Sequence, residues 1–148
     1  MKKTLKTLIR NRKTRKMQPF LNQKEKSNIV RFFIEMLNTI KLYHWRTRSF
    51  AQHKATDELY SKLNENIDTF VEILLGKNQS RVIMTEQRIN LYDAPTTMKL
   101  KDRIFEYREF LIDLNMQFDY RKDSDLLNVR DEILGNINQF LYLLSFDK

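Results

Sequence analysis

Residues 41–76 read KLYHWRTRSFAQHKATDELYSKLNENIDTFVEILLG and hold the most unusual side chains of this 148-residue protein. Both of its histidines, His44 and His53, and its only tryptophan, Trp45, lie near the start of the stretch. Acidic residues then recur at helical spacing as far as Glu72. This concentration of imidazole and carboxylate groups in one segment indicates a chemical role.

His53 and Asp57 are four residues apart, and Asp68 and Glu72 repeat that spacing further along the chain. On a helix with about 100° per residue, these side chains and Asn64 share one narrow stripe. The apolar side chains form a separate stripe, which consists of Leu59, Leu63, Ile67, Phe70 and Leu74. The segment is therefore predicted to be a helix with one apolar face and one face of nitrogen and oxygen ligands, which suit iron, manganese or zinc.

The two pairs of candidate ligands are too far apart for one metal ion to touch both. Their centres are about fifteen residues apart, or roughly 22 Å at the rise of an α-helix. In an antiparallel dimer with its axis near residue 62 or 63, each His/Asp end would lie against the partner's Asp/Glu end, because isologous contacts exchange i and j. The spacing predicts two identical metal sites per dimer, each shared between subunits.

At these residues the chain resembles the mini-ferritins called Dps, the DNA-binding proteins from starved cells. That family has His-Trp near the end of its first helix, then Phe-x-x-x-His-x-x-x-Asp, and then Asp-x-x-x-Glu eleven residues beyond the first Asp. The matching residues here are His44, Trp45, Phe50, His53, Asp57, Asp68 and Glu72.

The resemblance implies a ferroxidase centre at a dimer interface. Iron would be the metal, with manganese or zinc as alternatives, and the oligomer would be a shell of twelve subunits. His44, His53 and Asp57 would come from one subunit, and Asp68 and Glu72 from its neighbour. Trp45 would pack beside the site and shape the pocket without binding metal.

The segment from His44 to His53 is shorter than in the family, with Ser49 near the place of the usual glycine. His44 reaches the other ligands only if this shorter link lets the first helix end beside them. Two other functions stay open: a nucleic-acid-binding or packaging protein of the same fold with an inactive metal site, and a structural helical oligomer with neither activity. A metal site inside one bundle is disfavoured, since the chain has no Glu-x-x-His motif.

The rest of the chain is predicted to be all-α and to complete a ferritin-like four-helix bundle over residues 23–148. A capping box of Asn22 and Glu25 opens a helix that extends to about residue 48, and Gly76 is expected to end the second helix. Residues 77–96 are expected to form a long crossover that packs down and includes a short extra helix. The apolar stripe of the third helix is Leu100, Ile104, Tyr107, Leu111, Leu114 and Phe118, and that of the fourth is Leu127, Leu134, Ile137, Leu141 and Leu144.

The net charge of +8 comes entirely from the beginning of the chain. The remaining 128 residues carry nineteen basic and nineteen acidic side chains. Residues 1–22 are therefore predicted to be a flexible basic tail that binds DNA non-specifically by releasing counterions; a solvated tail, a nuclear localisation cluster and an organelle presequence are the alternatives. The basic residues are Lys2, Lys3, Lys6, Arg10, Arg12, Lys13, Arg15 and Lys16.

Composition excludes several other classes. The chain has no cysteine, so disulfides, thiolate zinc sites and a cysteine nucleophile are excluded. No apolar run reaches the length of a membrane span, and the first residues lack the apolar core of a secretory signal. A soluble intracellular protein is expected, in the cytoplasm or nucleoid, or in a virion if its source is viral.

Overall fold

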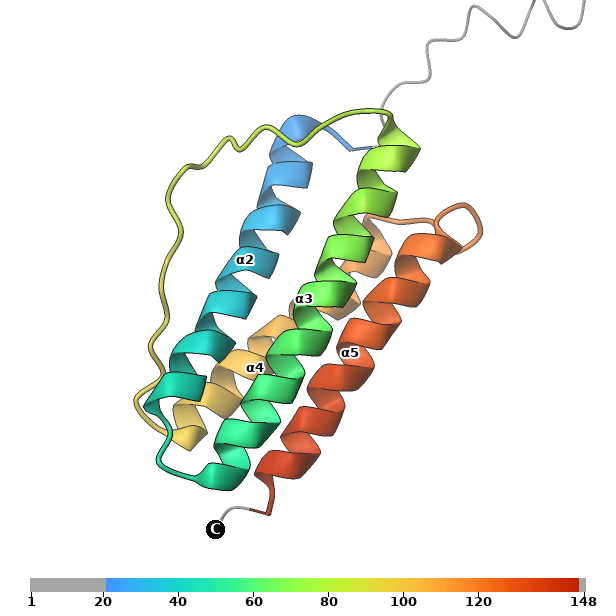
Figure 1. Cartoon of the computed structure of the whole chain (residues 1–148). Helices are drawn as coiled ribbons and strands as arrows, with labels where there is room; N and C mark the ends of the chain where they lie inside the picture. Colours follow the sequence, from blue (N-terminus) through green and yellow to red (C-terminus); the bar gives the residue numbers. More distant parts are fainter. Residues whose placement is uncertain (1–20, 147–148) are drawn as a thin grey trace, which may run out of the picture.

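The computed structural model describes residues 21–146 and contains four long helices. They are α2 (Gln23–Arg46), α3 (Phe50–Asn78), α4 (Thr97–Asp113) and α5 (Ser124–Leu144), with a short 3₁₀ helix, η1 (Leu114–Met116), after α4. Figure 1 shows α3 between α2 and α5, with α4 behind them. The all-α prediction is confirmed, and no helix in the described range is long and apolar enough to span a membrane.

The capping box at the start of α2 is confirmed, and it moves the boundary of the predicted tail. The Asn22 side chain accepts a hydrogen bond from the backbone N–H of Glu25 at 2.9 Å, and the Glu25 carboxylate accepts one from the Asn22 N–H at 2.8 Å. Leu21 is buried in the core. A flexible tail as far as residue 22 is therefore wrong for Leu21 and Asn22, while residues 1–20 lie outside the described range.

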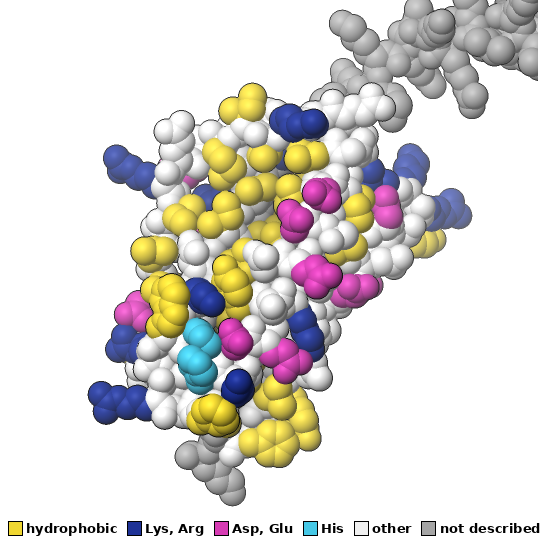
Figure 2. All heavy atoms as spheres, in the orientation of Figure 1, with side chains coloured by type: hydrophobic (Ala, Val, Ile, Leu, Met, Phe, Trp, Pro, Cys, Tyr) yellow, Lys and Arg dark blue, Asp and Glu magenta, His cyan; other side chains and the backbone are white. Residues whose placement is uncertain are grey.

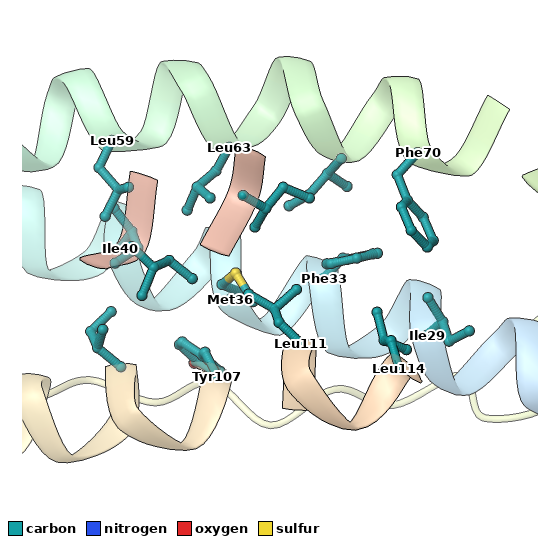
Figure 3. Packing of buried hydrophobic residues seen from close by; sticks show 14 of the residues in the cluster. Ile29, Phe33, Met36, Ile40, Leu59, Leu63, Phe70, Tyr107, Leu111 and Leu114 are labelled. Atoms are coloured by element: carbon teal, nitrogen blue, oxygen red, sulfur yellow. The ribbon is translucent and has the colours of Figure 1, made fainter. Parts of the chain in front are cut away.

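Most of the predicted apolar side chains form the core between the helices (Figure 3), but in α5 Leu134 and Leu141 are only partly buried, and Ile133 and Phe140 are buried instead. Phe33 of α2 is fully buried and meets the rings of Phe70 and Phe110 edge to face, with centroids 5.3 and 5.9 Å away. Leu114 and Phe118 are buried as expected, but they lie in and after η1, so the third helix is shorter than its apolar spacing suggested.

The ends of the first two helices differ from their predicted positions. Helix α2 stops at Arg46, and the link to α3 comprises only residues 47–49. Helix α3 passes through Gly76 and ends at Asn78, followed by Gln79 in the left-handed conformation with φ of 45°. The backbone N–H of Gln79 bonds to the Gly76 carbonyl, so the capping role predicted for Gly76 is taken by Gln79.

The connection of residues 79–96 contains no short helix in the structure, so that part of the prediction is wrong. It runs as an extended chain along α2 and enters α4 at the opposite end of the bundle (Figure 1). Ile83 and Leu91 are 67% and 66% exposed, so the connection packs down less than its apolar content suggested. Because of this path, α3 and α4 point the same way.

Polar side chains of α2 hold this connection through its backbone. Gln23 donates to the Arg81 carbonyl at 2.9 Å and accepts from the N–H of Ile83 at 3.0 Å. Lys26 is 2% exposed, and its ammonium donates to the Ser80 hydroxyl at 2.7 Å. Each backbone group that bonds to α2 is unavailable for a helix of its own, which explains the extended conformation.

Lys77 joins the end of α3 to the start of α5. Its ammonium donates to Asp125 at 3.1 Å and to the Lys122 carbonyl at 2.8 Å, and lies 3.4 Å from Asp123. Burial opposes the charge of Lys77, but the bonds to Asp125 and Asp123 outweigh it and raise its pKa. Burial likewise opposes the charge of Asp125, and the Lys77 hydrogen bond outweighs it and lowers the pKa of that carboxyl.

Replacement of Lys77 by Met is expected to lower the free energy of unfolding by roughly 1 kcal/mol at pH 7, because charge-assisted bonds at a partly exposed site are lost. The ionised Asp125 carboxyl contributes to the free energy of unfolding above the pKa that it has in the unfolded chain. This contribution is lost as the pH falls through the lower pKa of Asp125 in the folded protein. The charged Lys77 contributes to the free energy of unfolding below the pKa that it has in the unfolded chain. This contribution is lost as the pH rises through the higher pKa of Lys77 in the folded protein. Urea unfolding should therefore show a difference that is constant near neutral pH and smaller at about pH 2.

The exposed Lys24 provides a control for this measurement. A Lys24→Met variant, studied at the same protein concentration, should unfold like the unchanged protein at every pH. A Lys77→Met penalty that is just as large at acid pH would contradict an ionic origin.

Candidate metal centre

The short link between α2 and α3 brings the two histidines together. His44 lies in the last turn of α2 and His53 in the first turn of α3. The Ser49 side chain caps α3 by accepting a hydrogen bond from the Gln52 N–H at 3.2 Å. With only residues 47–49 outside the helices, the chain must reverse sharply, and this places the end of α2 against the start of α3.

The two imidazole rings stack on each other and are held by reciprocal hydrogen bonds. Their centroids are 3.9 Å apart, and their planes are inclined by 23°. Nδ1 of His44 lies 3.0 Å from the backbone carbonyl oxygen of His53, and Nδ1 of His53 lies 3.1 Å from the carbonyl oxygen of His44. Each ring is thus oriented by the backbone of the other residue.

These contacts determine which ring nitrogen carries the proton. A carbonyl oxygen can only accept, so each Nδ1 must donate, and Nε2 of a neutral ring is left as the bare nitrogen. The Thr56 hydroxyl agrees with this assignment. It donates to the carbonyl of Gln52 at 2.8 Å and that of His53 at 3.0 Å, so it can only accept from Nδ1 of His44, which lies 3.1 Å away. Metal-binding histidines usually have this arrangement, with the second ring nitrogen donating to a carbonyl.

Asp57 lies near one of the two rings, that of His44. Its carboxylate oxygen lies 4.0 Å from Nε2 of His44. The Asp57 side chain is 62% exposed, whereas the His44 side chain is only 9% exposed, and His53 is exposed. The short link therefore places His44 against His53 and within 4.0 Å of Asp57, but these three side chains are not among any group in residues 21–146 that could hold a metal ion as the chain stands.

Asp68 and Glu72 do not join this cluster within one chain. Helix α3 is uninterrupted from Phe50 to Asn78, so its two pairs of candidate ligands stay roughly 22 Å apart. Both acids are exposed, away from the core stripe, as predicted. Within residues 21–146, no three or more His, Cys, Asp or Glu side chains form a group that could hold a metal ion.

Trp45 does not pack into the protein as predicted. Its side chain is 69% exposed, and the Lys41 ammonium lies 5.7 Å from its ring centroid. The same ammonium is 4.4 Å from the ring of Tyr60. Trp45 therefore lies on the surface near the histidines. Its exposed ring could be buried only by contact with a second molecule.

Thr56 and Lys41 are neighbours of the site that the motif spacing does not indicate. Thr56 is buried although it is polar, and it lies three residues after His53, where a helical side chain can reach the same turn. Among the neighbouring charged side chains, Glu58 and Lys62 form an ion pair at 2.7 Å, as expected of a solvated face.

The surface around the cluster combines histidine, carboxylate and apolar groups. Figure 2 shows the two rings side by side on the face formed by α2 and α3, with acidic side chains beside them. Hydrophobic side chains gather on the same face. Ile34 of α2 is 37% exposed there, and Val71 and Leu75 of α3 are partly buried on the Asp68 side of the helix.

Comparison with known proteins places this chain among proteins of undetermined function. It is 31% identical over 106 residues to an Enterobacteria phage T4 protein described as an uncharacterized 14.6 kDa protein in the mobD-ri intergenic region, covering 70% of this chain and 75% of that protein. No solved structure matches. Residues 44–144, which begin at His44 and include all the candidate ligands, match a family of unknown function, DUF5856, and the protein belongs to that family.

Proposed function

We propose that this protein is a Dps-like, ferritin-like mini-ferritin that binds and oxidises Fe(II) at sites shared between two subunits. The observation that carries the proposal is the reciprocal bonding of His44 and His53. It holds two imidazoles with their Nδ1 atoms occupied and their Nε2 atoms bare, beside the Asp57 carboxylate. Histidine and carboxylate ligands of this kind suit iron.

The uninterrupted helix α3 supports a shared site. One chain supplies two imidazoles and a carboxylate at one end of the helix, and two further carboxylates roughly 22 Å away. Two antiparallel copies of α3 would bring Asp68 and Glu72 of the partner to the histidine cluster, and the same operation would complete the second site. The partly exposed apolar side chains beside this stripe would be buried between the two copies.

In this proposal Fe(II) is the substrate, and the residues supply its ligands. Neutral Nε2 atoms and ionised carboxylates would hold the ion, and the protein would leave positions open for peroxide or dioxygen. Oxidised iron would then move to a mineral core inside a larger shell. DNA binding by the basic tail stays a prediction, because its eight basic residues lie outside the described range. An intracellular location also stays a prediction.

Anaerobic titration of the metal-free protein with Fe(II) tests the proposal. The unchanged protein should bind iron at one shared site per chain, that is two sites per dimer, and behave as a dimer or larger oligomer in light scattering. His53→Ala should lose most of this binding and nearly all rapid oxidation, because an imidazole ligand is removed from each site. Glu132→Ala, which removes an exposed acid of α5, is the matched control and should bind iron normally.

Two results would contradict the proposal. One is iron binding and oxidation in His53→Ala at the level of the Glu132→Ala control. The other is a monomer that binds no iron, since a single chain has only part of the ligand set.

A further inference from the structure

A second polar site lies on the other side of the α2–α3 link, facing α4. This link cleft has a volume of about 630 Å³ and lies between the link, the start of α3 and the start of α4. Its lining includes the guanidinium groups of Arg46 and Arg48 and the hydroxyls of Tyr43, Thr47 and Thr97, and it contains no acidic residue. Figure 1 shows the three segments meeting at one end of the bundle.

The two arginines of the link cleft differ in how far their charge is neutralised. Arg46 donates to the Asp93 carboxylate at 2.8 Å, an ion pair whose side chains are 44% and 56% exposed. Arg48 is exposed and has no hydrogen-bond or ion-pair partner among the described residues. Because the lining contains no acidic residue and the charge of Arg48 is not neutralised by a described carboxylate, the cleft attracts anions, and Arg48 can bind one.

A hydrogen-bond network keeps the cleft in shape. The buried side-chain oxygen of Gln52 accepts from the hydroxyls of Tyr43 and Thr47, both at 2.8 Å, and the Gln52 amide donates to the Thr97 hydroxyl at 3.2 Å. The hydroxyls of Tyr43 and Thr97 are 2.8 Å apart. This network ties α2 to the starts of α3 and α4 and so fixes the positions of the residues that line the cleft.

We propose that the link cleft binds a phosphate group between Arg46 and Arg48. A tetrahedral phosphate offers several acceptor oxygens, which match donors that come from two guanidinium groups on one cleft. A phosphate has more acceptor oxygens than a carboxylate and can carry a second negative charge, so it is the better match to two guanidinium groups. The phosphate can be free orthophosphate or part of a nucleic-acid backbone, and both present the same oxygens to Arg48.

Calorimetric titration of the metal-free, full-length protein at fixed ionic strength tests this site independently of the metal centre. Orthophosphate should bind at one site per chain that Arg48→Gln weakens about tenfold or more, because a charge-assisted contact is lost. Arg88→Gln is the matched control; it removes an exposed arginine from the connection along α2 and should leave the affinity unchanged.

A second titration uses the dinucleotide thymidylyl-thymidine, whose single phosphate is a backbone diester. Binding that depends on Arg48 would identify the ligand as a nucleic-acid phosphate, and binding of orthophosphate alone would identify it as free phosphate. Equal affinities of Arg48→Gln and Arg88→Gln for both ligands would overturn the proposal, and so would the absence of any such site in the unchanged protein.

Discussion

Mixing two inactive variants, His53→Ala and Asp68→Ala, is expected to restore about a quarter of the iron-oxidising sites. Each variant alone should be inactive, because both sites of its dimer lack a ligand. After joint unfolding and refolding, about half of the dimers should contain one chain of each kind. In such a dimer, one site combines His53 of the Asp68→Ala chain with Asp68 of the His53→Ala chain and is intact. The other site lacks both ligands.

The rate of Fe(II) oxidation and the amount of iron bound per chain measure this recovery. The effect is large because it compares no intact site with about one in four. It also separates the shared site from any site within one chain, since ligands that all come from one chain could not be restored by mixing.

A mixture of His53→Ala and Asp57→Ala provides the matched control. In the proposed arrangement, His53 and Asp57 belong to the same side of each site, so every site in this mixture still has one defective side. No activity should return. Recovery in this control, or no recovery in the first mixture although mixed dimers have formed, would contradict the proposed sharing of ligands.

Phe33→Ala is expected to cause the largest loss of stability, about 3 to 5 kcal/mol. The Phe33 side chain is fully buried and contacts the rings of Phe70 and Phe110 edge to face. Truncation leaves a cavity at the meeting point of three helices, and it also removes two aromatic contacts. Chemical unfolding at a fixed protein concentration measures the change in free energy.

Phe50→Ala is the control for this substitution. Phe50 is 75% exposed at the start of α3, so its truncation should change the free energy of unfolding by no more than about 0.5 kcal/mol. Comparable losses in the two variants would show that Phe33 does not occupy the centre of the core.

The sequence allowed accurate prediction of features that depend on local periodicity. The core stripe of α3, from Leu59 to Leu74, is buried as predicted, and Asp57, Asp68 and Glu72 lie on a different, exposed face. These predictions succeed because a helix repeats every 3.6 residues, so the side of a residue follows from its number. The capping box at Asn22 is local in the same sense.

The errors concern contacts between distant parts of the chain. Arg130 of α5 donates to the Leu111 carbonyl at 2.7 Å and to Asn115 at 2.8 Å, where α4 gives way to η1. The apolar spacing of α4 could not reveal that contact. Likewise, hydrogen bonds from α2 side chains to the backbone of residues 79–96 hold that connection extended. These hydrogen bonds form only because the two segments lie side by side.

The sequence by itself determined that four helices form, which face of α3 is buried, and that imidazole and carboxylate groups share one stripe too long for a single site. Only the tertiary structure decided that His44 reaches His53, that each ring bonds to the backbone of the other residue, and that Arg48 borders a cleft with α4. The physical reason is that helical periodicity is set by neighbouring residues, whereas hydrogen-bond partners and clefts arise where separate helices meet.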